Sequence, residues 1–255
     1  MFEKVIVGGT VVDGGAMRRA DVAITGGRIA ALLPPGATHE AAATMDAIGC
    51  LILPGLIDAH AHLREPGLTH KEDFLSGTHA AALGGVTTVL DMPTDEPWTS
   101  TAEYLAAKMA MAEGRLHVDV GFQAALSRDL SLLPAMLDLA PVSVELFTAD
   151  VPDAFLFDTL DSVAEGLRAF EGAEMLVGIS PGDQSILSGS ATRDRSGSIA
   201  AFLGSRPPLA EAGGVARALT AAAATGTRIH VRQINSALGV EVWRRLRDVA
   251  DASIE

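Results

Sequence analysis

The chain has 255 residues, of which 48% are hydrophobic, and it carries a formal net charge of −13 and one cysteine. This acidic balance argues against nucleic acid as a partner, because neutralising phosphates needs a basic surface. No apolar run approaches the roughly 20 residues of a membrane span, and no charged and apolar leader opens the chain. Cys50 is the single cysteine and cannot form an intrachain disulfide, so we take a cytoplasmic location as the default. Because no apolar run is long enough to span a membrane, we expect no membrane partner.

Short apolar segments separated by glycine pairs characterise the first part of the chain. Segments 5–7, 10–12 and 21–24 are broken by Gly8-Gly9, Gly14-Gly15 and Gly26-Gly27. Strands of three to five residues joined by such turns are typical of small β-structures. We therefore predict a small β-sandwich domain over residues 1–53.

From residue 50 onward, strand and helix patterns alternate, which predicts a parallel α/β sheet. Six or seven such units in series favour a (β/α)8 barrel over an open sheet, and we assign it to residues 54–255. Because the seventh strand begins only at 252–255, we expect the sequence to end before the last barrel strands. The predicted strands are 50–62, 86–92, 117–123, 142–147, 175–179, 228–234 and 252–255; the predicted helices are 73–83, 100–114, 130–139, 156–171, 210–225 and 238–249.

Two histidines and an arginine stand at the end of the first predicted barrel strand. His60 and His62 are two residues apart, so on a strand both imidazoles lie on one face, where they can bind a metal. Arg64 follows at the same parity, and Pro66-Gly67 ends the strand. A pair of exposed histidines on an edge strand would look the same, but the preceding apolar run favours a buried strand that ends at a site.

Segments 51–67, 70–73 and 84–93 resemble the cyclic amidohydrolases. The stretch 64–67 is most similar to dihydroorotase, whereas 118–122 is more similar to allantoinase; 206–208, Glu211 and the segment around His230 also fit. The resemblance implies a metal-dependent (β/α)8 barrel with a small β-sandwich, which hydrolyses a C–N bond of a cyclic amide or ureide with a metal-activated water. It also implies a homo-oligomer. His60 and His62 would bind the first metal, and Arg64 would hold a substrate carboxylate.

The chain departs from that family pattern at four positions. Glu145 stands where the family has a metal-bridging carboxylated lysine on strand four, and no lysine lies on that strand. The ligand histidine of strand five is replaced by Ser180 or Gly178, depending on the alignment, and that of strand six by Gln233. Thr94 stands where a substrate-binding asparagine is usual, and the expected catalytic aspartate would fall beyond Glu255.

Two functions remain open on this evidence. In the first, the protein is a dihydroorotase-like hydrolase with a reduced site, in which His60, His62 and Glu145 hold one zinc or similar divalent ion per chain. Arg64 and Thr94 would then bind the substrate. In the second, it is an inactive homologue that serves as a structural or assembly partner, and Glu145 is only a charge at the strand end. The intact His-x-His pair and Arg64 favour the first function, and the altered positions favour the second.

His230 lies three residues before Gln233, and we place it on the opposite face of the strand. A histidine in that place would pack between the sheet and a helix. We therefore expect His230 to be no substitute for the missing ligand.

Overall fold

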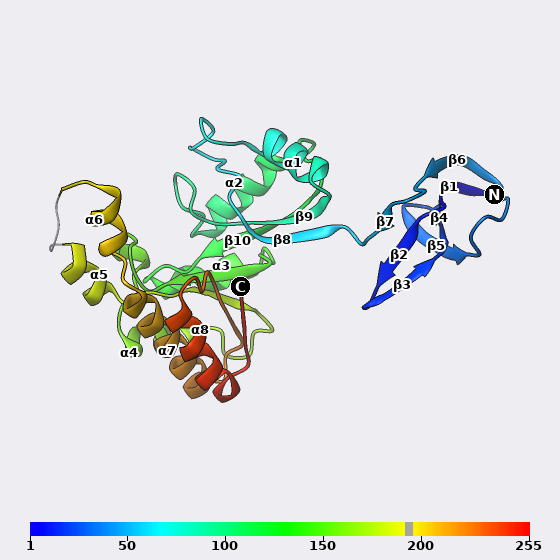
Figure 1. Cartoon of the computed structure of the whole chain (residues 1–255). Helices are drawn as coiled ribbons and strands as arrows, with labels where there is room; N and C mark the ends of the chain where they lie inside the picture. Colours follow the sequence, from blue (N-terminus) through cyan, green and yellow to red (C-terminus); the bar gives the residue numbers. More distant parts are fainter. Residues whose placement is uncertain (192–195) are drawn as a thin grey trace. The chain divides into compact units, whose positions relative to one another are not determined.

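The computed structural model describes residues 1–191 and 196–255, and these form two compact units, Met1–Leu56 and Ile57–Glu255 (Figure 1). Each unit has its own core, and we describe them separately. No helix among the described residues is long and apolar enough to cross a bilayer.

The first unit contains two small sheets. The four-stranded sheet has the order β5-β4-β1-β6, and the three-stranded sheet has the order β3-β2-β7. Val11, Ala20 and Val22 form a small buried cluster. The β-sandwich domain over 1–53 stays a prediction. The strands are β1 (Phe2–Val7), β2 (Thr10–Asp13), β3 (Ala16–Arg19), β4 (Asp21–Thr25), β5 (Arg28–Leu33), β6 (Ala41–Asp46) and β7 (Leu51–Ile52).

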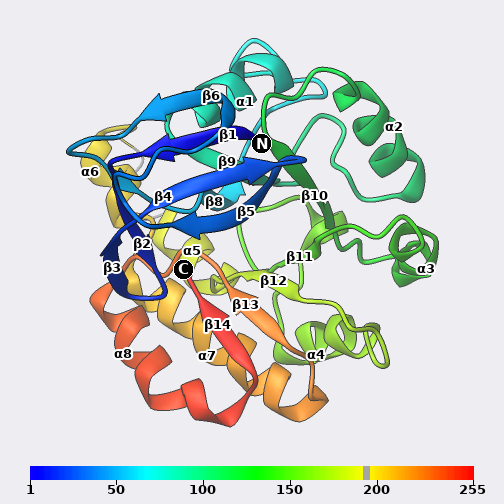
Figure 2. The same ribbon diagram turned by 90° about the vertical axis from the view of Figure 1, so that its right-hand side faces the viewer.

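The second unit is built on a seven-stranded sheet with the order β14-β13-β12-β11-β10-β9-β8. Neighbouring strands from β9 to β14 run parallel, which confirms the parallel sheet that the alternating pattern predicts. The sheet is curled, with helices gathered along its outer side (Figure 2). The strands are β8 (Leu56–Ala61), β9 (Val86–Asp91), β10 (Asp119–Ala125), β11 (Ser143–Phe147), β12 (Val177–Ser180), β13 (Ile229–Val231) and β14 (Ala252–Ile254).

Eight α-helices accompany these strands within the described residues. They are α1 (Phe74–Leu83), α2 (Ala102–Ala112), α3 (Leu133–Leu137), α4 (Leu160–Arg168), α5 (Gln184–Ala191), α6 (Ile199–Gly204), α7 (Pro208–Thr225) and α8 (Ala237–Leu246). Gly214 lets the alanine-rich α7 pack closely against the backbone at Gly182. A Cβ at position 214 would lie 2.2 Å from the Gly182 backbone nitrogen.

The elements differ from the predicted ones at a few boundaries. The predicted strand 50–62 is divided into β7 and β8 around Pro54, whose missing N–H cannot join a ladder. The predicted helix 156–171 begins only at Leu160, because Thr159 and Ser162 form a reciprocal capping box there. The sequence pattern did not predict α5 and α6.

A buried charged cluster lies between β9 and α2. Lys108 is fully buried, and its Nζ lies 2.7 Å from Asp91 Oδ2 and 2.6 Å from Asp95 Oδ2. It also donates to the Met92 carbonyl at 3.1 Å. Asp91 in turn accepts the Leu63 N–H at 2.8 Å, so the cluster ties α2 to the segment that follows β8.

Candidate functional site

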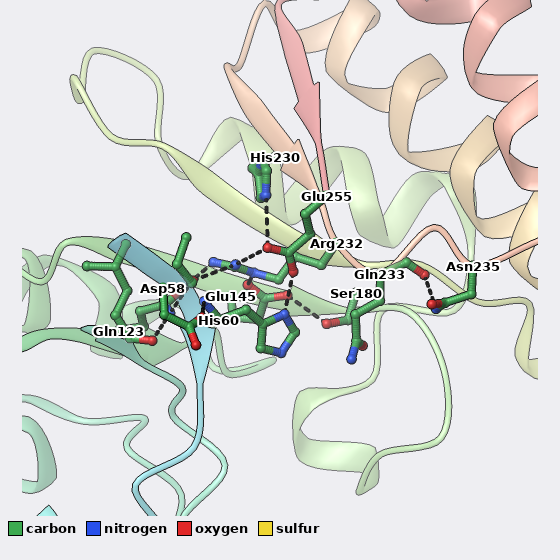
Figure 3. Close-up of polar contacts among 12 residues, drawn as sticks. Asp58, His60, Gln123, Glu145, Ser180, His230, Arg232, Gln233, Asn235 and Glu255 are labelled. Atoms are coloured by element: carbon green, nitrogen blue, oxygen red, sulfur yellow. Dashed lines mark hydrogen bonds and ion pairs between the residues drawn. The ribbon is translucent and has the colours of Figure 1, made fainter. Parts of the chain in front are cut away.

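A row of side chains crosses the inner face of the second unit's sheet. The parallel register pairs Glu145 on β11 with Gly178 on β12, Gly178 with His230 on β13, and His230 with Ser253 on β14. Because paired residues of parallel strands lie on the same face, the polar side chains of β11, β13 and β14 meet along this line, and Gly178 on β12 lies between them. Figure 3 shows Glu145, His230 and their polar partners gathered there.

Glu145 and Arg232 form a buried ion pair at the centre of this row. Glu145 is 0% exposed and Arg232 is 2% exposed. Arg232 Nε donates to Glu145 Oε2 at 2.6 Å, and Ser180 Oγ donates to Oε1 at 2.7 Å. Burial raises the pKa of Glu145, while the guanidinium and the Ser180 hydrogen bond act in the opposite direction. Both carboxylate oxygens therefore have a protein partner.

The other nitrogens of the Arg232 guanidinium reach two more strands. Nη1 donates to the Ala59 carbonyl on β8 at 3.2 Å, and Nη2 donates to Gln123 Oε1 on β10. Gln123 is held in turn by Ser143 Oγ, which donates to its Oε1 at 2.7 Å. One arginine on the segment after β13 thus connects β8, β10 and β11.

Gly178 leaves the space in which this ion pair lies. A Cβ at position 178 would lie 1.9 Å from Glu145 Oε2 and 2.8 Å from Arg232 Nε. Both distances are far below normal van der Waals contact, so no residue with a side chain fits here while the pair is in place.

Glu255 joins two histidines beside the ion pair. Its carboxylate contacts His60 Nδ1 and lies 3.5 Å from His230 Nε2 and 3.7 Å from Arg232 Nη1 (Figure 3). Burial raises the pKa of Glu255, but His60, Arg232 and His230 together outweigh burial, so the pKa of Glu255 is lowered overall. Since a carboxylate beside Nδ1 accepts its proton, the other nitrogen of His60, Nε2, is left for a ligand or a proton.

The expectation that His230 packs between the sheet and a helix was wrong. Its Nδ1 lies 2.8 Å from Ser253 Oγ and its Nε2 faces Glu255, so it lies with Arg232 on the inner face of the sheet and not against a helix. The reason is that β13 ends at Val231 and Gln233 has a positive φ of 52°. The alternation of side chains between the two faces of the strand therefore stops before Gln233. The face of His230 cannot be inferred by counting back from Gln233.

His62 lies beside His60, with ring centroids 5.5 Å apart and the planes tilted by 50°. Its Nδ1 is 3.1 Å from Thr94 Oγ1, so the two predicted residues His62 and Thr94 do meet. Burial first, then the charges of Arg64 and His60, lower the pKa of His62 to about 4. This imidazole is therefore neutral at pH 7.

Arg64 is half-buried and adopts a positive φ of 62°, which is unusual for a residue other than glycine. Within residues 1–191 and 196–255, no hydrogen bond or ion pair to its guanidinium is found. Backbone strain of this kind is typical of functional sites. Arg64 is thus a guanidinium beside the two histidines that can still bind an anion.

A cavity of about 480 Å³ opens at the carboxyl ends of β11 to β13. Such an opening is large enough for a small ring compound. Ser180 connects the cavity to the buried pair, because it lines the cavity and also donates to Glu145. A second cavity of about 570 Å³ lies at the opposite ends of β12 and β13. In barrel folds the chemistry takes place at the carboxyl ends, and the first cavity lies at that end of the sheet, although His60, His62, Arg64 and Thr94 are not among the residues that line it. Its lining includes Phe147, Ser180, Arg206, Pro207, Gln233 and Asn235.

Comparisons with known proteins agree with this geometry. A family model described as dihydro-orotase-like matches residues 49–238. The chain belongs to this family. It is 33% identical over 270 residues to an allantoinase from Salmonella gallinarum, an alignment that covers 100% of this chain and 58% of the relative. The chain therefore spans a little over half the length of the curated relatives it matches.

Solved structures of hydantoinases share the fold. The L-hydantoinase (dihydropyrimidinase) from Arthrobacter aurescens superimposes with a TM-score of 0.92 at 24% identity, covering 100% of this chain and 58% of that one. The D-hydantoinase from a Bacillus sp. AR9 gives 0.82 at 28% identity, covering 99% and 56%. The likeness supports the (β/α) barrel type of fold for the second unit.

The dihydro-orotase-like family is metal-dependent, so the donor set must be tested against a metal. The described residues contain no group of three or more His, Cys, Asp or Glu arranged to hold one. Glu145 is paired with Arg232 and Ser180, and a guanidinium at 2.6 Å repels any cation that would share the carboxylate. His60 and His62 are adjacent, but the arrangement does not join them with Glu145 around one ion. These residues do not fit the predicted metal centre as they stand.

The sequence patterns did not predict Arg232, Gln123 or Glu255 as site residues, nor the role of Gly178. Arg232 has the same parity as His230 and is a charge inside the predicted strand 228–234, which is a usable signal. Gln123 ends the apolar run of the third predicted strand in the same way. Gly178 was considered only as a replaced ligand, whereas its role is the space it leaves.

Proposed function

We propose that this protein binds a small cyclic amide or ureide at the carboxyl ends of the strands and opens its ring by hydrolysis. The single observation that carries the proposal is Arg64, a half-buried guanidinium beside His60 and His62 that has no hydrogen-bond or ion-pair partner among the described residues. Membership of the dihydro-orotase-like family and the likeness to allantoinase support the same substrate class.

Arg64 would hold a carboxylate or carbonyl oxygen of the ligand, since its planar fork can donate two parallel hydrogen bonds. Thr94, which lies 3.1 Å from His62, would contact the ring from the end of β9. Hydrolysis adds water across the C–N bond, so one proton must leave the water and one must reach the ring nitrogen. His60 is placed for both proton transfers. Glu255 contacts Nδ1 of its imidazole, so Nε2 is the nitrogen that would exchange protons with the substrate.

A second function, binding without turnover, is favoured by the Glu145–Arg232 pair. This pair stands where the family's bridging lysine is expected, and it removes Glu145 from the set of metal ligands. A protein of this kind would still bind a ligand at this site, but it would serve other proteins as a structural or assembly partner. The predicted homo-oligomer and cytoplasmic location rest on the sequence argument alone and stay predictions.

Titration calorimetry with allantoin, hydantoin and dihydroorotate, together with an assay of ring opening, tests both functions. For Arg64→Gln we expect at least tenfold weaker binding of dihydroorotate, because a charge-assisted bidentate contact of about 1.5–3 kcal/mol is lost. The matched control is Arg245→Gln, whose exposed side chain on α8 pairs with Glu241. Absence of binding by all three compounds would refute the substrate class.

The same assay separates the enzyme from the binding protein. If the protein is an enzyme, His60→Ala should abolish ring opening while binding is kept. Binding by the unmodified protein without any ring opening would instead select the second function.

A further inference from the structure

The charged groups on the inner face of the sheet were compared as a set. Among the described residues, Glu145 and Glu255 are the carboxylates that lie within 4 Å of the Arg232 guanidinium, and His60 and His230 face Glu255. The guanidinium lies 2.6 Å from one carboxylate and 3.7 Å from the other. Arg232 is therefore the group that balances the negative charge of this interior.

We propose that Arg232 is the resident cation among these residues and takes the structural place of a metal ion beside Glu145. A metal in such a site would neutralise the Glu145 carboxylate and join strands that are far apart in the sequence. Arg232 does both: its partners Ala59, Gln123 and Glu145 lie on three strands, 173, 109 and 87 residues away in the sequence.

The hydrogen bonds of the guanidinium show that it is a built part of the interior. Nε, Nη1 and Nη2 each donate to a different residue, and the side chain is 3% exposed. A guanidinium is planar and always charged, which suits three simultaneous and fixed hydrogen bonds. An incoming metal would have to displace it from Glu145 and leave its charge buried and unpaired.

The backbone on both sides is shaped for the pair. Gly178, between Glu145 and His230 in the register, leaves room for Glu145 Oε2 and for Arg232 Nε. Ser180, two residues later on the same strand, donates to the remaining oxygen of Glu145. Both positions where the family pattern expects a strand-five ligand are thus used by the Glu145–Arg232 pair.

This inference goes beyond the proposed function, and its test does not depend on substrate. The full chain is melted alone, with excess EDTA and with added zinc, and zinc is titrated into it by calorimetry. We expect the three melting temperatures to agree within about 1 °C and no saturable zinc binding, since the described residues offer no group of three or more metal ligands. About one zinc bound per chain, with EDTA lowering the melting temperature by several degrees, would overturn the proposal.

Variants of Glu145 and Arg232 test how much this ion pair contributes to the stability of the fold. Arg232→Met should lower the melting temperature by roughly 10 °C, because Glu145 is left buried and unpaired. The double variant Glu145→Met with Arg232→Met should regain most of this loss, since an apolar pair replaces both charges. The control Arg245→Met on the surface of α8 should shift it by only about 1 °C. An Arg232→Met protein that melts like the unmodified one would contradict the proposal.

Should Arg232→Met not fold, Arg232→Lys decides the question. Lysine keeps the positive charge but cannot make all three fixed hydrogen bonds. We expect a folded protein with a lowered melting temperature that zinc and EDTA leave unchanged. A melting temperature of Arg232→Lys that rises with zinc would show that a metal, and not the side chain, is the preferred cation.

Discussion

Replacing Gly178 by alanine should separate the buried ion pair. The new Cβ would lie 1.9 Å from Glu145 Oε2, so the carboxylate must move by about 1.5 Å to restore normal contact. That movement breaks the 2.6 Å hydrogen bond from Arg232 Nε, because no space remains on the side of the guanidinium, whose Nε is itself 2.8 Å from the Cβ. We expect a loss of about 3–5 kcal/mol in the free energy of unfolding, the range for breaking a buried pair.

Urea unfolding followed by tryptophan fluorescence measures this loss, since Trp98 and Trp243 both lie in the second unit. The matched control is Gly213→Ala within α7, where the Cβ would lie 3.5 Å from its nearest neighbour. That change should stabilise the protein by about 0.5–1 kcal/mol, the helix preference for alanine over glycine. A Gly178→Ala protein as stable as the unmodified one would refute the argument that position 178 must lack a side chain.

Three further predictions concern other buried charges. Lys108→Met should cost about 3–5 kcal/mol at pH 7 in urea unfolding, and less at pH 5, because it leaves Asp91 and Asp95 without their cation. Burial raises the pKa of Asp95 from its ordinary 3.8 to about 6, so the folded chain keeps a proton that the unfolded chain has released between these values. Stability should therefore fall by about 3 kcal/mol as the pH rises from about 4 to 6, and Asp95→Asn should flatten this slope; an unchanged slope would count against it. In the first unit, Asp21→Ala should speed hydrogen exchange of the Gly8 amide at least about tenfold, because that N–H donates to Asp21 Oδ1 at 2.9 Å.

The fold could be predicted because its signals are local. Apolar strands that alternate with amphipathic or alanine-rich helices specify a parallel sheet whatever the partners are. The capping box of Thr159 and Ser162, which sets the start of α4, is also a local signal. It was not predicted, because several nearby hydroxyl residues could have made the hydrogen bond to the backbone. The short helices α5 and α6 gave too few turns for a clear period.

The site could be predicted only in part. His60, His62 and Glu145 could be assigned to predicted strands, and strand parity then gives the face on which each side chain lies. It could not identify the partner of Glu145, because Arg232 is 87 residues away and any charged side chain on a neighbouring strand was a candidate. The contact between His60 and Glu255 spans 195 residues and has no local signal at all.

The burial of Lys108 has a practical consequence for chemical labelling. The chain contains three lysines, and Lys4 and Lys71 are exposed, one in each compact unit. An amine-reactive reagent should therefore modify these two lysine side chains in the folded protein, while Lys108 reacts only after α2 has separated from β9. The rate at which Lys108 gains a label, read by mass spectrometry, would thus report the opening of this part of the second unit without any engineered probe.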